Sequence, residues 1–535
     1  MPRISLRGLF FTLLSISGLI YLVHFYGMVQ RSQVDRLVNK VSQIKLPWNI
    51  TYPLGDSFRN SEMSLQNHQR QQAVRDAMAH AWKGYTEYAF GKDELQPISL
   101  SSNNRWGDWA ITLVDSLDTL KLMEMDAEYT EAKEHLRGID FSKTPQGFRT
   151  PVFEMTIRAL GGLLGAYELD DDPMILEKAR QVGDTLSYAY SESTNGLPST
   201  WLDVNQKKGD FSPSVCIAEA GTVQLEFKKL SQYTGDPKYA KLAERASDAL
   251  ENGMRRHQGL YPSFIYTTTN KYDNTSALSV GAMADSFYEY QLKQYVLHGG
   301  RQNKYKEQYV AATEAVKQKL MAKSKSGLLF LGRWGFNETI FYNEMEHLAC
   351  FYPGLLALGA QVLDRPQDLV VAEELARTCY LSYKVTPTGL GPEIFSFPES
   401  AQLVEDTTGI HYAPNKYGIV PKDPRYILRP ETVEALFVLY RVTENPRYQE
   451  WGWDIFNAIE KYTKTDVAYA AYINVYDTTP ANNWSDSMES FFLAETLKYL
   501  YLLFSPTDLL PLDEYVLNTE AHPLKIMKPS EEDAK

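Results

Sequence analysis

The sequence predicts an all-α fold, a closed barrel of helical hairpins with an inner and an outer ring of helices. One unit recurs from about Asn67: an apolar helix, a short turn often marked by proline, and an amphipathic helix. The turns lie at Asp126–Glu128, Asp172–Pro173, Asp236–Pro237, Arg301–Asn303, Arg365–Pro366, Asn445–Pro446 and Ser505–Pro506. Residues 494–504 are apolar nearly all round, whereas residues 176–186 show one polar face. This contrast predicts buried inner helices and solvent-facing outer helices.

Seven turns imply seven apolar helices and seven amphipathic partners. The apolar helices are expected to start near Asp108, Val152, Val215, Ala277, Glu344, Pro430 and Asp486. Their partners are expected to start near Asn67, Glu128, Met174, Lys238, Lys304, Gln367 and Arg447. An open solenoid is the alternative, but loops as long as residues 385–429 favour a closed barrel. Strand-like patches at Thr267–Thr269 and Ile394–Phe397 are expected to form hairpins on the loops.

The N-terminal segment predicts a membrane anchor. Residues 8–30 contain no Asp, Glu, Lys or Arg and are long enough to span a bilayer, after a short cytoplasmic tail, residues 1–7. Residues 31–64 are polar and aperiodic and are expected to form a stem. Residues 65–525 would form the barrel and residues 526–535 a polar tail. Sequons at Asn49, Asn274, Asn337 and Asn483 all follow the anchor, which favours a single-pass type II protein with a lumenal body.

Charge and cysteine content narrow the function further. The net charge is −13, and because residues 1–50 carry +5, the remainder carries −18. Such an acidic body argues against nucleic acid as a partner and suits a cation or an uncharged ligand. The three cysteines are Cys216, Cys350 and Cys379. In a secretory compartment this odd count predicts one disulfide and one spare thiol, with three pairings open.

Acidic residues recur near the N-terminal ends of the apolar helices. They are Glu154, Glu219, Asp285, Glu346, Glu431, Glu434 and Glu489. If the inner helices run parallel, these carboxylates converge on one cavity, together with Arg158, His347 and Arg429. Glycoside hydrolysis needs convergent carboxylates, one to protonate the leaving oxygen and one to activate water. For any single one of these residues, a structural role in helix capping or ion pairing is as good an explanation as a catalytic role. The structural role is favoured most for Glu219, which lies between two alanines.

Several long motifs carry a family resemblance. They are VFEMTIRALGGLLGAY (152–167), ADSFYEYQLKQY (284–295), EHLACFYPGLLALGA (346–360), PTGLGPEIFSF (387–397), RPETVEALFVLYR (429–441), MESFFLAETLKYLYLLF (488–504) and NTEAHPL (518–524). In this order they closely resemble glycoside hydrolase family 47, the class I α-1,2-mannosidases of the secretory pathway. The resemblance implies an (αα)7 barrel and a monomeric, Ca²⁺-dependent, inverting hydrolase. It would remove terminal α-1,2-linked mannose from high-mannose N-glycans in the Golgi or endoplasmic reticulum.

The resemblance also assigns roles to individual residues. Glu154 matches the general acid, acting through a water, Glu431 matches the general base, and Asp285 is a third essential carboxylate. Thr519 matches the residue that gives Ca²⁺ its carbonyl and hydroxyl oxygens, hard ligands that suit this ion. The positions that match substrate-binding or water-orienting residues are Arg158, Met283, His347, Arg429, Glu434, Phe491, Glu495 and Glu520. The resemblance pairs Cys350 with Cys379, and we expect Cys216 to be a buried thiol.

Met283 bears on specificity. The endoplasmic-reticulum type that removes a single mannose tends to carry Arg at this position, two residues before Asp285. Methionine cannot hydrogen-bond a glycan branch as Arg could, so it favours a broader, Golgi-like enzyme. Two other functions compete with this interpretation. The first is a mannose-binding quality-control factor, which would lack a catalytic carboxylate or the calcium threonine, whereas this chain has all of them. The second is a helical scaffold without an active site, which would not explain the ring of acidic residues.

Overall fold

The described part of the chain is predominantly helical, as the sequence predicts. The structure, a computed structural model, describes residues 64–210, 212–399 and 403–528. Among them, no helix is both long and apolar enough to cross a membrane. The predicted tail, anchor and stem, together with the Asn49 sequon, lie outside the described residues.

Helices form pairs in the predicted order, although the first helices of five pairs begin 8 to 11 residues after the predicted starts. The pairs are α3 (Ile111–Leu122) with α4 (Asp126–Gly138), α6 (Gly161–Asp170) with α7 (Pro173–Ser187), α9 (Gln224–Thr234) with α10 (Lys238–Glu251), α11 (Asp285–Leu297) with α12 (Asn303–Lys319), α13 (Tyr352–Val362) with α14 (Pro366–Lys384), α15 (Glu431–Thr443) with α16 (Arg447–Tyr462), and α17 (Leu497–Phe504) with α2 (Leu65–Ala89). The last pair joins segments from opposite ends of the described chain.

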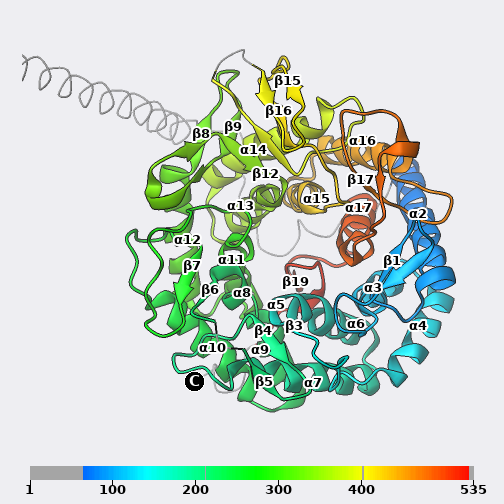
Figure 1. Cartoon of the computed structure of the whole chain (residues 1–535), viewed down its shortest axis with the longest axis vertical. Helices are drawn as coiled ribbons and strands as arrows, with labels where there is room; N and C mark the ends of the chain where they lie inside the picture. The colour runs from blue at the N-terminus through cyan, green and yellow to red at the C-terminus, as the bar shows by residue number, and fades with distance from the viewer. Residues whose placement is uncertain (1–63, 211, 400–402, 529–535) are drawn as a thin grey trace, which may run out of the picture. The chain divides into compact units, whose positions relative to one another are not determined.

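The first member of each pair contacts the next one around a circuit. Contacts run from α3 through α6, α9, α11, α13, α15 and α17, and the π-helix η6 (Phe492–Thr496), which leads into α17, returns to α3. Figure 1 shows these helices around the centre, with α4, α7, α10, α12, α14 and α16 outside them. Almost every residue of α17 is buried, whereas α10 and α16 bury one face. The predicted contrast between inner and outer helices is therefore present.

Four inner helices are preceded by short helical turns. These turns are α5 (Val152–Glu154) with the π-helix η1 (Met155–Leu160), α8 (Ile217–Ala220), the 3₁₀ helix η4 (His347–Phe351) and η6. Other 3₁₀ turns are η2 (Tyr188–Tyr190), η3 (Phe336–Glu338) and η5 (Pro480–Asn482). The helix expected from Ala277 begins only at Asp285, because residues 277–284 form a turn stabilised by the Ala284 and Asp285 N–H groups donating to the Gly281 carbonyl.

Short antiparallel strands occupy the loops between helices. The strands are β1 (Glu94–Gln96), β2 (Ser101–Asn103), β3 (Thr150–Pro151), β4 (Trp201–Asp203), β5 (Lys208–Gly209), β6 (Ser214–Cys216), β7 (Phe264–Tyr266), β8 (Met321–Lys323), β9 (Leu329–Leu331), β10 (Arg333–Trp334), β11 (Phe341–Tyr342), β12 (Glu344–Glu346), β13 (Ile394–Ser396), β14 (Val404–Glu405), β15 (His411–Tyr412), β16 (Val420–Asp423), β17 (Ala471–Tyr472), β18 (Trp484–Ser485), β19 (Tyr515–Leu517) and β20 (Pro523–Lys525).

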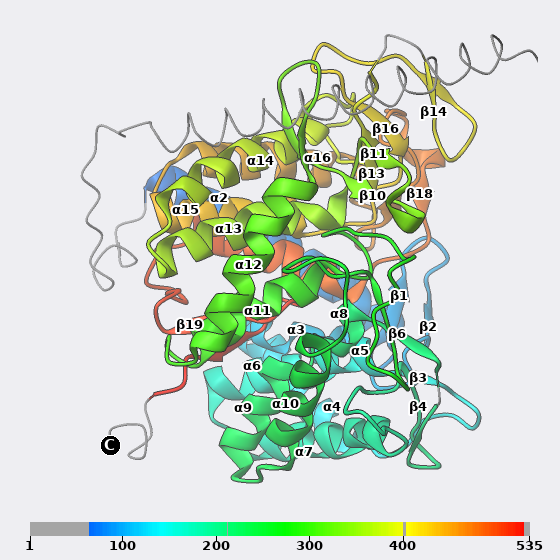
Figure 2. The same cartoon turned by 90° about the vertical axis from the view of Figure 1, so that its left-hand side faces the viewer.

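Two of the sheets have three strands, in the orders β3-β4-β5 and β12-β13-β16. The predicted strand at Ile394–Phe397 is β13, but Thr267–Thr269 form the turn after β7 rather than a strand. Figure 2 shows most of the labelled strands at one end of the helical body and β19 toward the other end. The β19–β20 hairpin packs against α11 and α6, so it contacts the inner helices.

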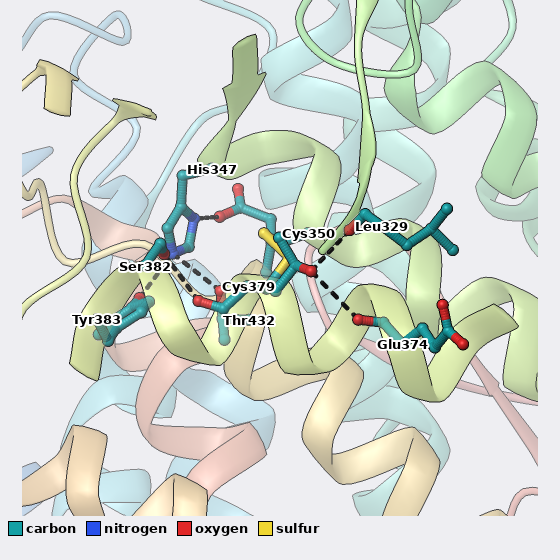
Figure 3. Close-up of a disulfide and its surroundings, with 10 residues drawn as sticks. Leu329, His347, Cys350, Glu374, Cys379, Ser382, Tyr383 and Thr432 are labelled. Carbon is teal, nitrogen blue, oxygen red and sulfur yellow. Dashed lines mark hydrogen bonds and ion pairs between the residues drawn. A yellow bond between two sulfur atoms is a disulfide. The ribbon is translucent and has the colours of Figure 1, made fainter. Parts of the chain in front are cut away.

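The disulfide confirms the pairing that the resemblance implied. Cys350 in η4 and Cys379 in α14 are bonded, with their Cα atoms 5.9 Å apart (Figure 3). Cys216 is a buried free thiol, as expected, and its burial raises its pKa. The bond links η4, which leads into the inner helix α13, to the outer helix α14. Cys350 lies three residues after His347.

Candidate functional site

Glu431 lies at the first position of α15 and is bonded to His347, the first residue of η4. The Glu431 Oε2 atom lies 2.6 Å from His347 Nδ1, and His347 Nε2 lies 2.6 Å from the Tyr383 hydroxyl. Figure 3 shows the His347 ring beside Tyr383 and Thr432. Burial raises the pKa of Glu431, but the hydrogen bond to His347 and the charge of Arg429 outweigh it, so the net shift is downward. Glu431 is therefore held as a carboxylate.

Arg429 connects Glu431 to a carboxylate that the sequence analysis did not single out. Its Nε atom lies 2.8 Å from both oxygens of Glu393, and its Nη1 atom lies 3.6 Å from Glu431 Oε1. Burial raises the pKa of Glu393 despite the adjacent guanidinium. Glu393 directly precedes β13 and lies inside the family motif at residues 387–397. Its place in this motif was the signal by which the sequence could have identified it.

Asp285 has the opposite electrostatic environment to Glu431. It is the first residue of α11, and its carboxylate accepts the N–H of Ser286. Burial, and then the negative charges of Glu346, Glu289 and Glu431, raise the pKa of Asp285 to about 7. Asp285 therefore retains a proton under conditions in which Glu431 is ionised.

Glu154 lies at the end of α5 and pairs with Arg158 on the next turn. Its Oε2 atom lies 2.8 Å from Arg158 Nε, and the buried guanidinium also reaches Glu520 Oε1 at 2.9 Å. The Arg158 guanidinium lies over the rings of Trp106 and Phe491, 5.3 and 5.5 Å from their centroids. Arg158 therefore links the acid predicted to donate a proton to an aromatic side chain predicted to contact sugar.

The floor of the site is an acidic cluster. Four buried carboxylates lie near one another, those of Glu289, Glu434, Glu495 and Glu520. Burial raises the pKa values of Glu434, Glu495 and Glu520. The charge of Glu289 adds to the shift of Glu434, that of Glu520 to the shift of Glu495, and that of Asp115 to the shift of Glu520. Among the described residues, Lys293 pairs with Glu289 and lies 4.0 Å from Glu434. The cluster holds more negative charge than Lys293 and Arg158 neutralise, so a bound cation would stabilise it.

Thr519 lies in the turn of the β19–β20 hairpin beside this cluster. Its N–H lies 3.4 Å from the Tyr290 hydroxyl, and within the described residues neither its carbonyl oxygen nor its hydroxyl makes a hydrogen bond. These oxygens and the acidic surroundings fit a hard cation such as Ca²⁺. Among the described residues, no group of three or more His, Cys, Asp and Glu side chains forms a ligand set by itself. Water would have to complete a coordination shell around Thr519.

Several predicted residues serve other roles. Glu219 accepts a hydrogen bond from Thr200 (2.9 Å), in keeping with its structural interpretation, and Glu489 pairs with Arg105. Glu346 accepts the N–H of Ala282 (2.7 Å), beside Met283. Met283 is 47% exposed and has a φ of 72°, so its side chain is available to a ligand.

The sequons are not equivalent in the structure. Asn337 is exposed and Asn274 is half-buried. Asn483 does not fit its predicted role, because it is only 3% exposed and its side-chain nitrogen lies 2.9 Å from the Asn474 carbonyl and 3.3 Å from that of Asp477. A glycan on that nitrogen would break both bonds, so we withdraw Asn483 as an attachment site.

Buried polar residues near the site were also missed by the sequence analysis. Glu94 is buried, and desolvation together with the charge of Glu489 raises its pKa to about 7, against the lowering effect of Arg105. Asp115 and His522 are fully buried and contact each other. In the sequence Asp115 lies within an apolar stretch, where no periodic pattern distinguishes it, whereas His522 lies inside the family motif at residues 518–524, which was the available signal for it.

The arrangement defines a class of protein. Glu431 has a lowered pKa and Asp285 a raised one, and basic and aromatic side chains lie beside them. These are the groups that glycoside hydrolysis requires. The family model of glycosyl hydrolase family 47 matches residues 77–526. The chain belongs to this family and is a glycoside hydrolase.

Relatives agree with this assignment. The chain is 41% identical over 482 residues to a mannosyl-oligosaccharide 1,2-α-mannosidase of Arabidopsis thaliana, covering 86% of this chain and 79% of the relative. It is 39% identical over 472 residues to the human endoplasmic reticulum mannosyl-oligosaccharide 1,2-α-mannosidase, covering 86% of this chain and 64% of the relative. The solved α-1,2-mannosidase from Trichoderma reesei is 30% identical, with a TM-score of 0.79, covering 86% of this chain and 99% of that one.

Proposed function

We propose that this protein is an inverting α-1,2-mannosidase with an (αα)7 barrel, which removes terminal mannose from high-mannose N-glycans. The observation that carries the proposal is the contrast between Glu431, whose pKa is lowered, and Asp285, whose pKa is raised to about 7. An inverting glycosidase needs one ionised and one protonated carboxyl group at the same time. The names of the relatives supply the substrate class.

In this mechanism Glu431 is the general base. Its carboxylate, oriented by His347 and Arg429, takes a proton from the water that attacks the anomeric carbon. The leaving sugar oxygen receives a proton from the acid. The resemblance gives that role to Glu154 acting through a water, whereas the raised pKa favours Asp285 as the group that stores the proton. Arg158 orients Glu154, and Phe491 offers a ring on which the sugar stacks.

Thr519 would hold Ca²⁺ through its carbonyl and hydroxyl oxygens. Bound there, Ca²⁺ would coordinate sugar hydroxyls and fix the orientation of the ring to be cleaved. Glu434, Glu495 and Glu520 would accept hydrogen bonds from waters and sugar hydroxyls around such an ion. Burial raises the pKa values of these three carboxyl groups, and a cation bound beside them would lower those values.

The site of action would be the lumen of the Golgi or the endoplasmic reticulum. Residues 8–30 would anchor the protein as a single-pass type II membrane protein, with residues 31–64 as the stem. Names of relatives, such as the human endoplasmic reticulum enzyme, support the secretory pathway. Asn274 and Asn337 remain candidate glycan sites, and the protein would act as a monomer on glycans carried by other proteins.

One assay tests the proposal. The purified protein is incubated with a nine-mannose oligosaccharide, with and without a calcium chelator, while glycan size and the anomer of the released sugar are measured. We expect loss of several mannoses, released first as β-mannose, and no release after chelation. Tight calcium-dependent glycan binding without release would instead establish a mannose-binding quality-control factor.

A further inference from the structure

A buried polar network joins the β19–β20 hairpin to Arg158. Its centre is Asp115 in α3, whose Oδ1 atom lies 3.0 Å from His522 Nε2. The other oxygen of Asp115 accepts the Ser490 hydroxyl, and Ser490 Oγ in turn accepts from Arg158 Nη1 at 2.8 Å. Asp115, Ser490 and His522 are fully buried, so water does not screen these contacts.

His522 fixes one side of the hairpin turn. Its Nδ1 atom lies 2.9 Å from Asp118 Oδ2, so carboxylate oxygens face both ring nitrogens. Burial and the charge of Lys498 lower the pKa of His522, but the charge of Asp118 and the hydrogen bonds to both carboxyl groups outweigh them, so the net shift is upward and favours the imidazolium. Lys498 Nζ donates to the same oxygen of Asp118 (2.9 Å) and to the Ala521 carbonyl (2.8 Å), so a second cation holds the turn.

Asn518 fixes the other side of the turn. Its Oδ1 atom accepts the N–H groups of Glu520 (2.9 Å) and His522 (2.8 Å), and its Nδ2 atom donates to the Ile157 carbonyl at 3.1 Å. Gly161 permits this close approach, because a Cβ there would lie 2.5 Å from Asn518 Nδ2 and 2.9 Å from His522 Cδ2. Thr519 is therefore held between two anchored neighbours.

The second arm of the network ends at Glu154. Arg158, which donates to Ser490, also bonds Glu154 through Nε at 2.8 Å. A continuous path thus runs from the Thr519 turn through His522, Asp115, Ser490 and Arg158 to Glu154. We propose that Asp115 is a positioning residue that aligns the calcium-binding turn with the Arg158–Glu154 pair. This inference rests on the proposed function, because it assumes that the turn binds Ca²⁺.

The test compares two readouts on the full chain. The first is the calcium concentration at the midpoint of the Tm increase, measured by titrating chelator-stripped protein without substrate. The second is kcat/KM at saturating calcium. The variants are D115N, which removes the charge at equal volume, and S490A, which cuts only the arm to Arg158. D368N is the matched control, since Asp368 is a fully buried carboxylate paired with Lys317 and Arg365.

We expect D115N to raise the calcium midpoint and to lower kcat/KM, each by roughly 10- to 100-fold, as is typical of residues behind metal ligands. S490A should lower kcat/KM by about tenfold at an unchanged calcium midpoint, with partial recovery in S490T. D368N should lower Tm alone. A D115N protein that changes one readout only, or neither beyond D368N, overturns the proposal.

Three further outcomes are decisive. If D115N does not fold, S490A decides, and an unchanged kcat/KM in S490A refutes the path through Asp115 to Arg158. If the unmodified protein neither binds calcium nor releases mannose, the proposed function fails and this inference falls with it. If the unmodified protein does both and the variants change neither readout, only the inference fails.

Discussion

The imidazole of His347 lies between the Glu431 carboxylate and the Tyr383 hydroxyl, 2.6 Å from each. The Glu431 carboxylate only accepts, so Nδ1 of His347 donates to it, and Nε2 can then accept from Tyr383. This arrangement keeps the ring in one tautomer and occupies Oε2 of Glu431. The other oxygen, Oε1, lies 3.6 Å from Arg429 Nη1 and would act as the base in the proposed mechanism.

Replacing His347 should therefore impair catalysis more than binding. In H347N the shorter side chain loses the bond to Glu431, and we expect kcat to fall by roughly 10- to 100-fold with a smaller change in KM. Steady-state kinetics with a mannose disaccharide would measure both. Y383F, which removes only the outer bond, is the matched variant and should lose less. An H347N enzyme with unchanged kcat would contradict the role given to the ring.

Asp285 should set the alkaline limb of the pH profile. Its protonated form is the active one if it stores the proton, and because its pKa is about 7, kcat/KM should decline as the pH rises through about 7. α-Mannosyl fluoride, whose leaving group needs no proton, supplies the control. D285N should retain much of its activity on the fluoride while losing activity on the disaccharide. The same rescue in E154Q, and not in D285N, would assign the donor to Glu154.

Met283 should control how many mannoses are removed. M283R introduces a hydrogen-bond donor at an exposed position without changing backbone strain, since both side chains carry a Cβ at a φ of 72°. We expect trimming of a nine-mannose glycan to stall at an earlier product than in the unmodified protein, as resolved by glycan chromatography. M283L is the neutral control. Identical product series from M283R and M283L would show that this position does not select branches.

Loss of the disulfide should destabilise the protein and reduce activity. Cys350 and Cys379 are 29 residues apart, and closing a loop of this length contributes about 3–4 kcal/mol in the chain-entropy model. We expect the double Ala variant to unfold at lower denaturant concentration, with C216A as the matched control that retains the bond. The residual activity of the folded fraction should also fall, since His347 lies on the same short helix as Cys350. Equal midpoints in the two variants would exclude a stabilising role.

The helical framework was predictable because burial repeats with helical periodicity. Segments such as α15 and α17 show it directly. The helix α15 begins one residue after the predicted Pro430, whereas α17 begins at Leu497, after the π-helix η6, 11 residues beyond the predicted Asp486. The start of α11 was not predictable, because residues 277–284 are small and apolar enough to resemble a helix. Arg158 and Glu495 lie on π-helical turns, a feature for which the sequence contains no signal.

The site was predictable only in part. Carboxylates at helix starts, such as Glu431 and Asp285, follow a positional pattern. Asp115 and His522 do not, since their pairing joins residues about 400 positions apart and depends on the turn of the C-terminal hairpin reaching the side chains of α3. Asn483 was misjudged because a sequon contains no information on burial. Long-range polar contacts of this kind become visible only in three dimensions.

The pairing of α2 with α17 has a consequence for biosynthesis. The helix α2, which includes the fully buried Val74 and Met78, packs against α17, which leaves the ribosome only after more than 400 further residues have been made. At typical rates of translation this interval lasts about 20 to 80 s. During that time the apolar face of α2, near the beginning of the nascent chain, is not yet covered by α17. We therefore expect newly made chains to depend on chaperones until their final helix emerges.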